Sequence, residues 1–384
     1  MSGRPVYVRG VGLHPFGRFD DRTVTELGRH AVREALREAR VSRGGFQAAF
    51  CGTVYTGVAA GHKVLTSLGL SGVPIVNVEA GCASGGAALS LGVSQVASGQ
   101  CDTVLVFGME KMPRGIIRSS FFPPWCEKAG LTPAPAYFAL RARRLMQESG
   151  VTREQLARVS VKNHANGVDN PYAMYRKPFT LEQVLESKMV CDPLTLFMLC
   201  SPNEGSACVV LGATPAPVGS PIRVLASVVR SHLAGSALGE HTPMSGRVGD
   251  DPPSPTELAA GEAFAAAALG PEDLDVVEVQ DTDAGREILS IEELGLCRRG
   301  DGAAFVEDGV GERGGRLPVN PSGGLLSKGE PLGASALGQI VELTWQLRGA
   351  AERRQVENAR TALGHTVGRG ANASVAILQR SSAS

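Results

Sequence analysis

Short apolar runs of strand length alternate with longer helical patterns along the first third of the sequence. Thr23 to Ala39 places apolar residues at helical spacing with Arg and Glu between them, which is typical of an amphipathic helix. Gly85 to Ala97 is small and apolar on nearly every face, which predicts a fully buried helix. The predicted strands are Val6 to Val11, Ala48 to Val54, Ile75 to Val78 and Thr103 to Phe107. This alternation indicates an α/β domain.

The pattern changes between Pro113 and about Cys191, where prolines interrupt it and aromatic and basic residues collect. We expect an irregular, partly helical insertion there rather than a second sheet. The alternation then resumes, so each half carries strands, a glycine-lined turn and a helix, and a two-fold internal repeat is plausible. The elements predicted for this second part are strands at Cys208 to Leu211, Ile222 to Val229, Val276 to Val279 and Ser374 to Leu378, a loop from Gly246 to Pro255, and helices from Thr256 to Leu269 and up to about Leu347.

The composition is that of an ordinary globular protein. Among 384 residues, 38 Lys and Arg balance 38 Asp and Glu, so charge gives no reason to expect nucleic acid or an anionic membrane as partner. The N-terminus has no signal-peptide pattern and no apolar stretch approaches 18 residues, so we expect a soluble, cytoplasmic protein. The eight cysteines form no CxxC pair and show no zinc spacing, so we expect buried thiols and no metal site.

One of these cysteines has a position suited to catalysis. Cys82 follows a predicted strand, begins a predicted helix and is flanked by small residues. A helix N-terminus stabilises a thiolate through its dipole and its unpaired N–H groups. Cys82 is therefore a candidate nucleophile, although a small core residue in a glycine-rich turn would fit the same pattern.

Several motifs in the same order resemble the thiolase superfamily, and in particular its sterol-carrier-protein, or lipid-transfer, branch. Residues 82–85 followed by a small-residue helix resemble the thiolase nucleophile loop. Residues 200–207 are similar to the branch motif CSPxxDGAAA, and residues 320–329 are similar to its glycine-rich segment. Residues 162–164 and 170–171 match the insertion of that branch. The resemblance runs over nearly the whole chain.

This resemblance implies the thiolase fold, a five-layer αβαβα sandwich of two repeated halves with an inserted loop domain. It divides the chain into an N-terminal half (1–112 and 193–214), a loop domain (113–192) and a C-terminal half (215–384). It implies a homodimer that pairs through the strand before the nucleophile, and relatives often work with a small OB-fold partner protein. The substrate would be an acyl group on coenzyme A or a carrier protein, with no permanently bound cofactor. Related members serve in secondary metabolism or steroid side-chain degradation.

The departures from the family pattern concern its acid and base groups. Family members carry Gly-His-Pro, whose histidine activates the nucleophile, whereas this chain has Glu330 there. The branch motif HDCF supplies an oxyanion-hole histidine and a second cysteine, and here those two positions hold Gln280 and Thr282. His365 survives in the last motif. Ordinary thiolysis is therefore not expected, because a thiolase needs both a base and oxyanion donors.

These residues define the expected site. Cys82 is the nucleophile, Glu330 or His365 is the base, and Gln280 can donate to an oxyanion through its amide. By resemblance, His164 and the turn of Ser322, Gly323 and Gly324 would contact coenzyme A. Two further expectations concern charged residues: Arg141, Arg143 and Arg144 belong to a solvated helix face rather than a phosphate site, and Asp283 belongs to a solvated loop.

Three functions remain open from the sequence. The first is an acyltransferase that loads an acyl group onto Cys82 and passes it to an acceptor carbon. The second is a lyase that cleaves a β-hydroxyacyl-CoA by a retro-aldol reaction, with Glu330 or His365 moving the proton. The third is a non-catalytic subunit of a hetero-oligomer, in which Glu330 marks a decayed site.

Overall fold

A single mixed sheet organises the molecule. The computed structural model describes residues 3–117, 124–233, 252–368 and 372–381. Within them nine strands pair in the order β3-β2-β4-β7-β1-β8-β11-β10-β9. The bounds of these strands are β1 Val6–Gly17, β2 Ala48–Gly52, β3 Ile75–Val78, β4 Thr103–Lys111, β7 Glu204–Gly212, β8 Ile222–Ser231, β9 Val276–Glu278, β10 Thr361–Val367 and β11 Asn372–Arg380.

The sheet consists of two halves that meet at the β1–β8 pair. β2 runs parallel to β3 and β4, and β4 is antiparallel to β7. The first eight residues of β4 and all of β7 are buried, which explains their nearly continuous apolar sequence. Only three residue pairs, starting with Val6 and Val224, join β1 to β8. The two halves are therefore held together mainly by the helices that lie between them.

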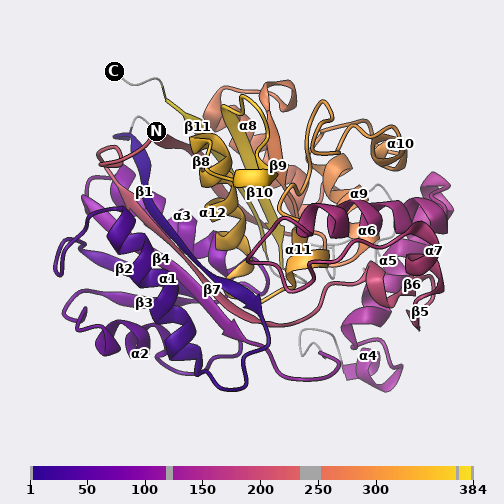
Figure 1. Cartoon of the computed structure of the whole chain (residues 1–384), viewed down its shortest axis with the longest axis horizontal. Coiled ribbons are helices and arrows are strands. Elements are labelled where there is room, and N and C mark those ends of the chain that lie inside the picture. The colour runs from indigo at the N-terminus through magenta and orange to yellow at the C-terminus, as the bar shows by residue number, and fades with distance from the viewer. Residues whose placement is uncertain (1–2, 118–123, 234–251, 369–371, 382–384) are drawn as a thin grey trace.

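Five layers result from the way in which the helices cover these halves. The helices α3 (Ser84–Ala97) and α12 (Ser335–Arg348) each contact strands of both halves, so they form the central layer. On the outer faces, α1 (Val24–Glu38) covers β1 and β7, and α8 (Pro255–Ala267) covers β8 and β11. Figure 1 shows the first half in indigo and purple, with α1 and α2 (Ala60–Ser67) on its outer face. The αβαβα arrangement of layers expected from the sequence is confirmed.

The insertion is more helical than the prolines suggested. Its main elements are α4 (Pro124–Lys128), α5 (Ala134–Ser149), α6 (Arg153–Gly167), α7 (Leu181–Glu186), the hairpin β5–β6 (Met189–Cys191 and Leu194–Thr195) and the short helix η1 (Leu196–Met198). Figure 1 shows these elements grouped at the right of the molecule. They pack against α9 (Ala284–Glu293), α10 (Gly302–Glu307) and α11 (Gly324–Lys328) of the C-terminal half. The loop domain therefore packs directly against the C-terminal half of the molecule.

Other expectations agree with the structure to within a few residues. The helix predicted from Thr23 corresponds to α1, which Thr23 caps by accepting a hydrogen bond from the Glu26 N–H. The strand predicted over Ile75 to Val78 coincides with β3. The pattern did not predict β10 or α9. Part of the predicted loop from Gly246 lies outside the described residues, and the boundaries drawn between the two halves and the loop domain stay predictions.

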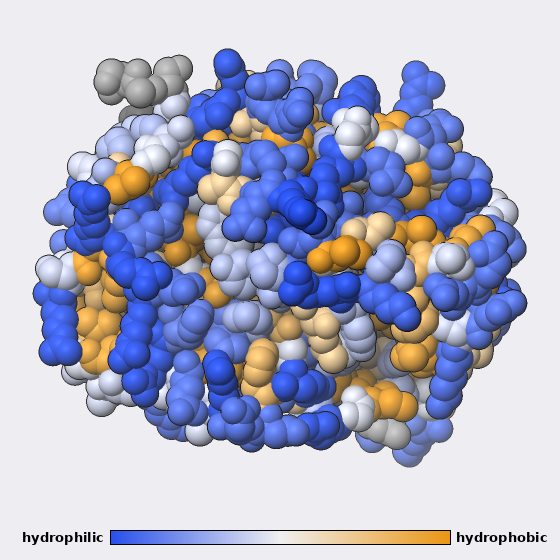
Figure 2. All heavy atoms as spheres, viewed as in Figure 1, coloured by the Kyte–Doolittle hydropathy of each residue, from blue (hydrophilic) through white to orange (hydrophobic). Residues whose placement is uncertain are grey.

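The surface fits this layered interior. Figure 2 shows one face covered mostly by hydrophilic residues, with apolar residues scattered between them. Among the described helices, none combines the length and the apolar character that a bilayer crossing requires.

Candidate active site

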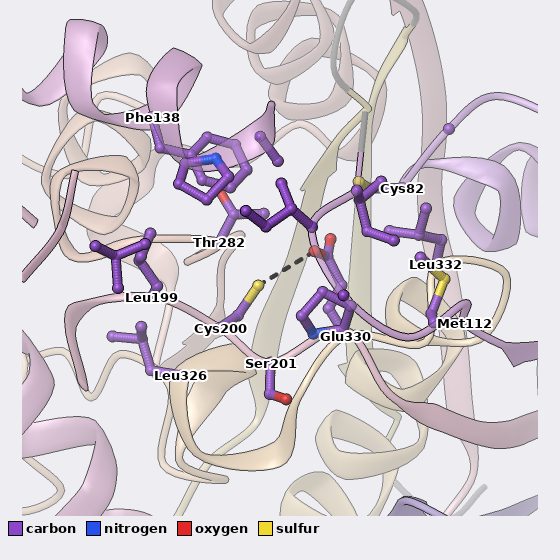
Figure 3. A pocket seen from close by; sticks show the side chains of 18 of the residues that line it. Cys82, Met112, Phe138, Leu199, Cys200, Ser201, Thr282, Leu326, Glu330 and Leu332 are labelled. Atoms are coloured by element: carbon purple, nitrogen blue, oxygen red, sulfur yellow. Dashed lines mark hydrogen bonds between the residues drawn. The ribbon is translucent and has the colours of Figure 1, made fainter. Parts of the chain in front are cut away.

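A cavity of about 530 Å³ opens where the loop domain meets both halves of the sheet. Its wall is mainly apolar, and includes Met112, Ile117, Phe138, Leu199, Leu326 and Leu332. Four side chains with ionisable groups of catalytic interest also reach it: Cys82, His164, Cys200 and Glu330. Figure 3 shows the labelled side chains gathered around the carboxylate of Glu330.

Cys82 lies in a tight turn between β3 and α3. Gly81 has φ +60°, a conformation that strongly favours glycine, and the Ser84 hydroxyl donates to the Gly81 carbonyl. Cys82 then directly precedes Ala83, the N-cap of the 14-residue helix α3. The side chain is half-buried and lines the cavity. The expected position of Cys82 at a helix start, open to a ligand, is therefore what the structure shows.

Glu330 reaches the same cavity from the turn between α11 and α12. Gly329 has φ +86°, and a Cβ there would come within 1.9 Å of the Asn203 side-chain nitrogen. The Glu330 N–H donates to the Ser201 carbonyl at 2.9 Å, which fixes the turn against the segment before β7. The Glu330 side chain is buried, with 4% of its surface exposed.

Two neutral side chains hold the carboxylate of Glu330. The Gln280 amide Nε2 donates to Oε1 at 2.8 Å, and the Cys200 thiol donates to Oε2 at 3.3 Å. Burial and then the charge of Glu330 raise the pKa of Cys200 well above its ordinary value, so Cys200 remains a thiol. Gln280 was expected to donate to an oxyanion, whereas here its amide is directed at Glu330 and it does not line the cavity.

His365 lies behind Gln280 rather than on the cavity wall. Its Nε2 is 3.0 Å from the Thr256 hydroxyl, and its Nδ1 accepts from the Gln280 N–H at 3.5 Å. Complete burial, with a smaller contribution from Arg286, lowers its pKa well below the ordinary value. Both ring nitrogens are therefore in contact with Thr256 and Gln280, and His365 does not line the cavity that Cys82 lines. Of the two residues predicted as the base, Glu330 lines the cavity and His365 does not.

His164 lines the cavity from α6 of the loop domain. Its ring packs edge-on against Phe179, with the ring centroids 4.9 Å apart, and it also contacts Tyr175 and Phe197. Burial lowers the pKa of His164 to about 4, so the imidazole is neutral at physiological pH. A neutral ring in this position can exchange hydrogen bonds with an uncharged part of a ligand but adds no charge.

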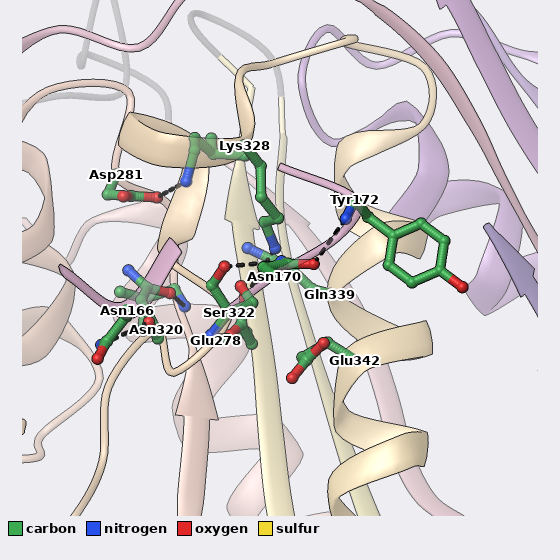
Figure 4. A network of polar contacts seen from close by, with 12 residues as sticks. Asn166, Asn170, Tyr172, Glu278, Asp281, Asn320, Ser322, Lys328, Gln339 and Glu342 are labelled. Carbon is green, nitrogen blue, oxygen red and sulfur yellow. Dashed lines mark hydrogen bonds and ion pairs between the residues drawn. The ribbon is translucent and has the colours of Figure 1, made fainter. Parts of the chain in front are cut away.

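The turn of Ser322, Gly323 and Gly324 does not line the cavity. The Ser322 hydroxyl donates to Glu278 at 2.6 Å, and Glu278 also pairs with Lys328 at 3.0 Å. Figure 4 shows this polar network within the protein. Because all three turn residues are buried, the expectation that they contact coenzyme A finds no support in this geometry.

Two residues that were expected to be solvated, Asp283 and Arg141, are buried instead. Asp283 is fully buried; it caps α9 by accepting from the Arg286 N–H and pairs with Arg141, which is only 2% exposed. Both side chains are shielded from solvent because α5, which carries Arg141, packs directly on α9, which Asp283 caps. Arg143 and Arg144 do form surface ion pairs, with Asp192 and Glu148.

Glu110 supports the cavity wall from the end of β4. Its carboxylate accepts from the backbone N–H groups of Val54 at 2.8 Å and Tyr55 at 3.1 Å, two residues that line the cavity. Burial raises the pKa of Glu110 to about 7, against the opposing effect of these hydrogen bonds. Among the described residues no group of three His, Cys, Asp or Glu side chains could hold a metal ion.

Cys200 was not among the site residues predicted from the sequence. The motif of residues 200–207 was already visible, but it identified the family rather than a contact with Glu330. Only the fold brings a residue before β7 to a residue 130 positions later.

Family comparisons agree with this architecture. Residues 6–192 match the model of the thiolase N-terminal domain, and residues 246–380 match the model of the thiolase C-terminal domain-like family. The chain is 39% identical to the acetyl-CoA acetyltransferase of Methanothermobacter thermautotrophicus, covering 98% of this chain and 100% of that protein. It is 34% identical to sterol carrier protein 2 of Oryctolagus cuniculus, covering 97% of this chain and 71% of that protein.

A solved structure has the same fold. The structure described as the Ltp2-ChsH2(DUF35) aldolase superposes with a TM-score of 0.86, covers 99% of both chains and is 24% identical.

Proposed function

The chain belongs to the thiolase family, and from that premise we propose that it is an acyltransferase that loads an apolar acyl group onto Cys82. The observation that carries the proposal is the cavity itself. It brings a thiol at a helix N-terminus and a buried carboxylate into one largely apolar space of about 530 Å³. The acyl donor is a thioester of coenzyme A or of a carrier protein.

The chemistry proceeds in two steps. The Cys82 sulfur attacks the thioester carbonyl, the carbon–sulfur bond to coenzyme A breaks, and the thiol proton ends on the departing coenzyme A sulfur. The carboxylate of Glu330 then takes a proton from the acceptor carbon, and the resulting carbanion attacks the acyl group and releases the Cys82 thiolate. The thiolate takes the proton back from Glu330, which restores both the thiol and the carboxylate. The Glu330 carboxylate accepts hydrogen bonds from Gln280 and Cys200.

The apolar wall of the cavity determines which acyl groups we expect the protein to favour. Phe138, Leu199 and Leu326 face the cavity, and two of the residues at its edge, Tyr55 and Ile116, are 44% and 67% exposed. Burying an apolar chain against such a wall contributes roughly 25 cal/mol per Å². We therefore expect acyl groups larger than acetyl to load faster. A small OB-fold partner remains part of the proposal, supported by the second component named in the aldolase structure.

Acyl loading tests the proposal directly. The protein is incubated separately with acetyl-CoA, hexanoyl-CoA and benzoyl-CoA, and intact mass and peptide mapping locate any adduct. We expect an acyl adduct on Cys82 that forms faster with the two larger groups. Cys82→Ala should lose the adduct and Cys297→Ala should keep it. Glu330→Gln should still load Cys82 but should not transfer the group onward.

The same samples separate the alternatives. No adduct from any thioester would contradict the acyltransferase, and release of an aldehyde or ketone from a β-hydroxyacyl-CoA would then support the retro-aldol lyase. Thiolysis of acetoacetyl-CoA should be at least ~100-fold slower than in a standard thiolase, because the family's second cysteine is replaced by Thr282. Thiolysis at a standard rate would show that this motif has been matched to the wrong residues.

A further inference from the structure

His164 is a buried polar side chain on the wall of a largely apolar cavity. Only 1% of its surface is exposed, yet it lines the same cavity as Cys82. We propose that the His164 imidazole selects the acyl group by accepting a hydrogen bond from a hydroxyl that the acyl group carries away from its thioester. The inference rests on the proposed function, because it names the class of acyl group, hydroxylated rather than plain hydrocarbon, that this site takes.

Aromatic rings surround the imidazole on the protein side. The ring of Phe179 lies edge-on to it with the centroids 4.9 Å apart, and the rings of Tyr175 and Phe197 lie at 6.0 Å. Phe179 and Phe197 also stack on each other, with their centroids 4.0 Å apart. Neither ring nitrogen of His164 makes a hydrogen bond with the part of the chain that the structure describes. The packing therefore orients the imidazole without satisfying its polar atoms.

The protonation of His164 decides which ligand group it can recognise. Burial lowers its pKa to about 4, against a smaller and opposite effect of the Phe197 backbone, so the ring is neutral. A neutral imidazole has one N–H and one nitrogen that only accepts. The Phe197 backbone or the face of a neighbouring ring can engage at most the N–H, and a ring face does so weakly. The accepting nitrogen therefore lacks a donor among the described residues, and a ligand hydroxyl would supply one.

The place of His164 in the cavity favours a contact with the acyl chain over a contact with coenzyme A. Its helix α6 packs against η1 and α11. Figure 3 shows Leu199, which directly follows η1, and Leu326 of α11 across the cavity from Cys82. Ile116 also lines the cavity and is 67% exposed, so it marks a side that is open to solvent. A thioester at Cys82 that keeps the large, charged coenzyme A on the open side directs its acyl chain toward the buried imidazole.

A histidine that only filled space would be a poor choice at this position. A buried acceptor without a donor costs stability, and a leucine or phenylalanine would pack among the same aromatic rings without that cost. A hydroxyl that donates to the imidazole removes the cost. An acyl group without the hydroxyl leaves the nitrogen unsatisfied, which is how a polar group in a binding site rejects an apolar analogue.

Matched thioesters test the inference. The pairs are hexanoyl-CoA with 6-hydroxyhexanoyl-CoA, octanoyl-CoA with 8-hydroxyoctanoyl-CoA, and benzoyl-CoA with 4-hydroxybenzoyl-CoA, which place the hydroxyl at different distances from the thioester. The second-order rate constant for loading Cys82 is measured for each. In at least one pair the wild type should prefer the hydroxylated member, and His164→Leu should lower that preference about tenfold. His164→Gln keeps an accepting oxygen and should retain part of the preference. His62→Leu, which changes an exposed histidine on α2, should leave it unchanged.

Binding to Cys82→Ala separates this inference from the proposed function, because that variant cannot form the adduct. Isothermal titration calorimetry with the same pairs should show the hydroxylated member bound more tightly, and His164→Leu added to Cys82→Ala should lower this advantage about tenfold. No preference for the hydroxyl in any pair, or a preference that survives His164→Leu, would overturn the inference. A loss of affinity for free coenzyme A in His164→Leu would also overturn it, by assigning the imidazole to coenzyme A. Binding that prefers the hydroxyl without any loading of Cys82 would instead overturn the acyltransferase and uphold the inference.

Discussion

At the scale of single residues, the site combines one half-buried thiol that lines the cavity with carboxyl groups whose environments differ. Glu330 accepts from a thiol and an amide, whereas Glu110 accepts from backbone N–H groups behind the cavity wall. Such differences arise because desolvation, hydrogen bonds and nearby charges act separately on each group. Sequence motifs identified Cys82 and Glu330, but they could not identify Cys200, because its partner is set by the meeting of two distant turns.

Glu110 should make stability fall as the pH rises toward neutrality. Its pKa is raised to about 7 in the folded protein, so the folded state binds a proton that the unfolded state releases near pH 4.5. The contribution is complete below about pH 4.5 and is lost as the pH rises through 7, up to about 3 kcal/mol. Glu110→Gln removes the titration.

The measurement is urea unfolding of both proteins between pH 4.5 and pH 8. The free energy of unfolding of the wild type minus that of Glu110→Gln should fall steadily as the pH rises over this interval. Only the change with pH is interpreted, because the amide also alters the hydrogen bonds to Val54 and Tyr55. A difference that stays constant across the interval would contradict a raised pKa at Glu110.

At the scale of elements, sequence patterns predicted the strands and helices of the first half well, and the contacts between elements poorly. Ile75 to Val78 and the α1 helix follow directly from hydrophobic spacing and a capping box. The burial of Asp283 did not follow, because an acidic residue in a loop is usually solvated. Its pairing with Arg141 requires α5 to dock on α9, and such docking leaves no periodic signal.

A buried ionic network joins α6 of the loop domain to the C-terminal half. Lys162 pairs with Glu287 at 2.8 Å and donates to the Val319 carbonyl at 2.8 Å. Asn163 bridges Glu287 and Asp281, and burial together with the charge of Glu287 raises the pKa of Asp281 well above its ordinary value. Lys162 is the cation paired directly with Glu287, whereas Lys328 acts electrostatically on Asp281.

Lys162→Met should destabilise the protein by about 3–5 kcal/mol, because it leaves Glu287 buried without its cation. Arg158 is the matched control on the same helix: its pair with Glu307 is about half exposed, so Arg158→Met should cost at most about 1 kcal/mol. Adding Glu287→Gln to Lys162→Met should recover part of the loss. Urea unfolding measures all three variants, and equal effects of Lys162→Met and Arg158→Met would rule out the network as a determinant of docking.

At the scale of the whole molecule, the two edges of the nine-stranded sheet are treated differently. The outer edge of β9 is covered by the chain itself, since Val277 bridges Val319 and accepts from the Asn320 N–H at 2.9 Å. β3, at the other edge, pairs only with β2 among the described residues. An open edge beside apolar side chains invites another strand. Val76 on β3 and Leu91 on α3 are both more than 40% exposed.

We therefore predict a dimer in which two copies of β3 pair across a two-fold axis. Such an arrangement covers the open edge, places Val76 and Leu91 of each copy in the interface, and should bury roughly 2,000 Å² or more. Val76→Lys puts a charge at the centre of this contact, so light scattering after size-exclusion chromatography should show the mass fall from two chains to one. Val218→Lys changes a valine of similar exposure in the loop between β7 and β8, and should remain dimeric. A wild-type protein that is monomeric at micromolar concentration would rule out the dimer. A Val76→Lys variant that still elutes as a dimer would show that the contact lies elsewhere than at β3.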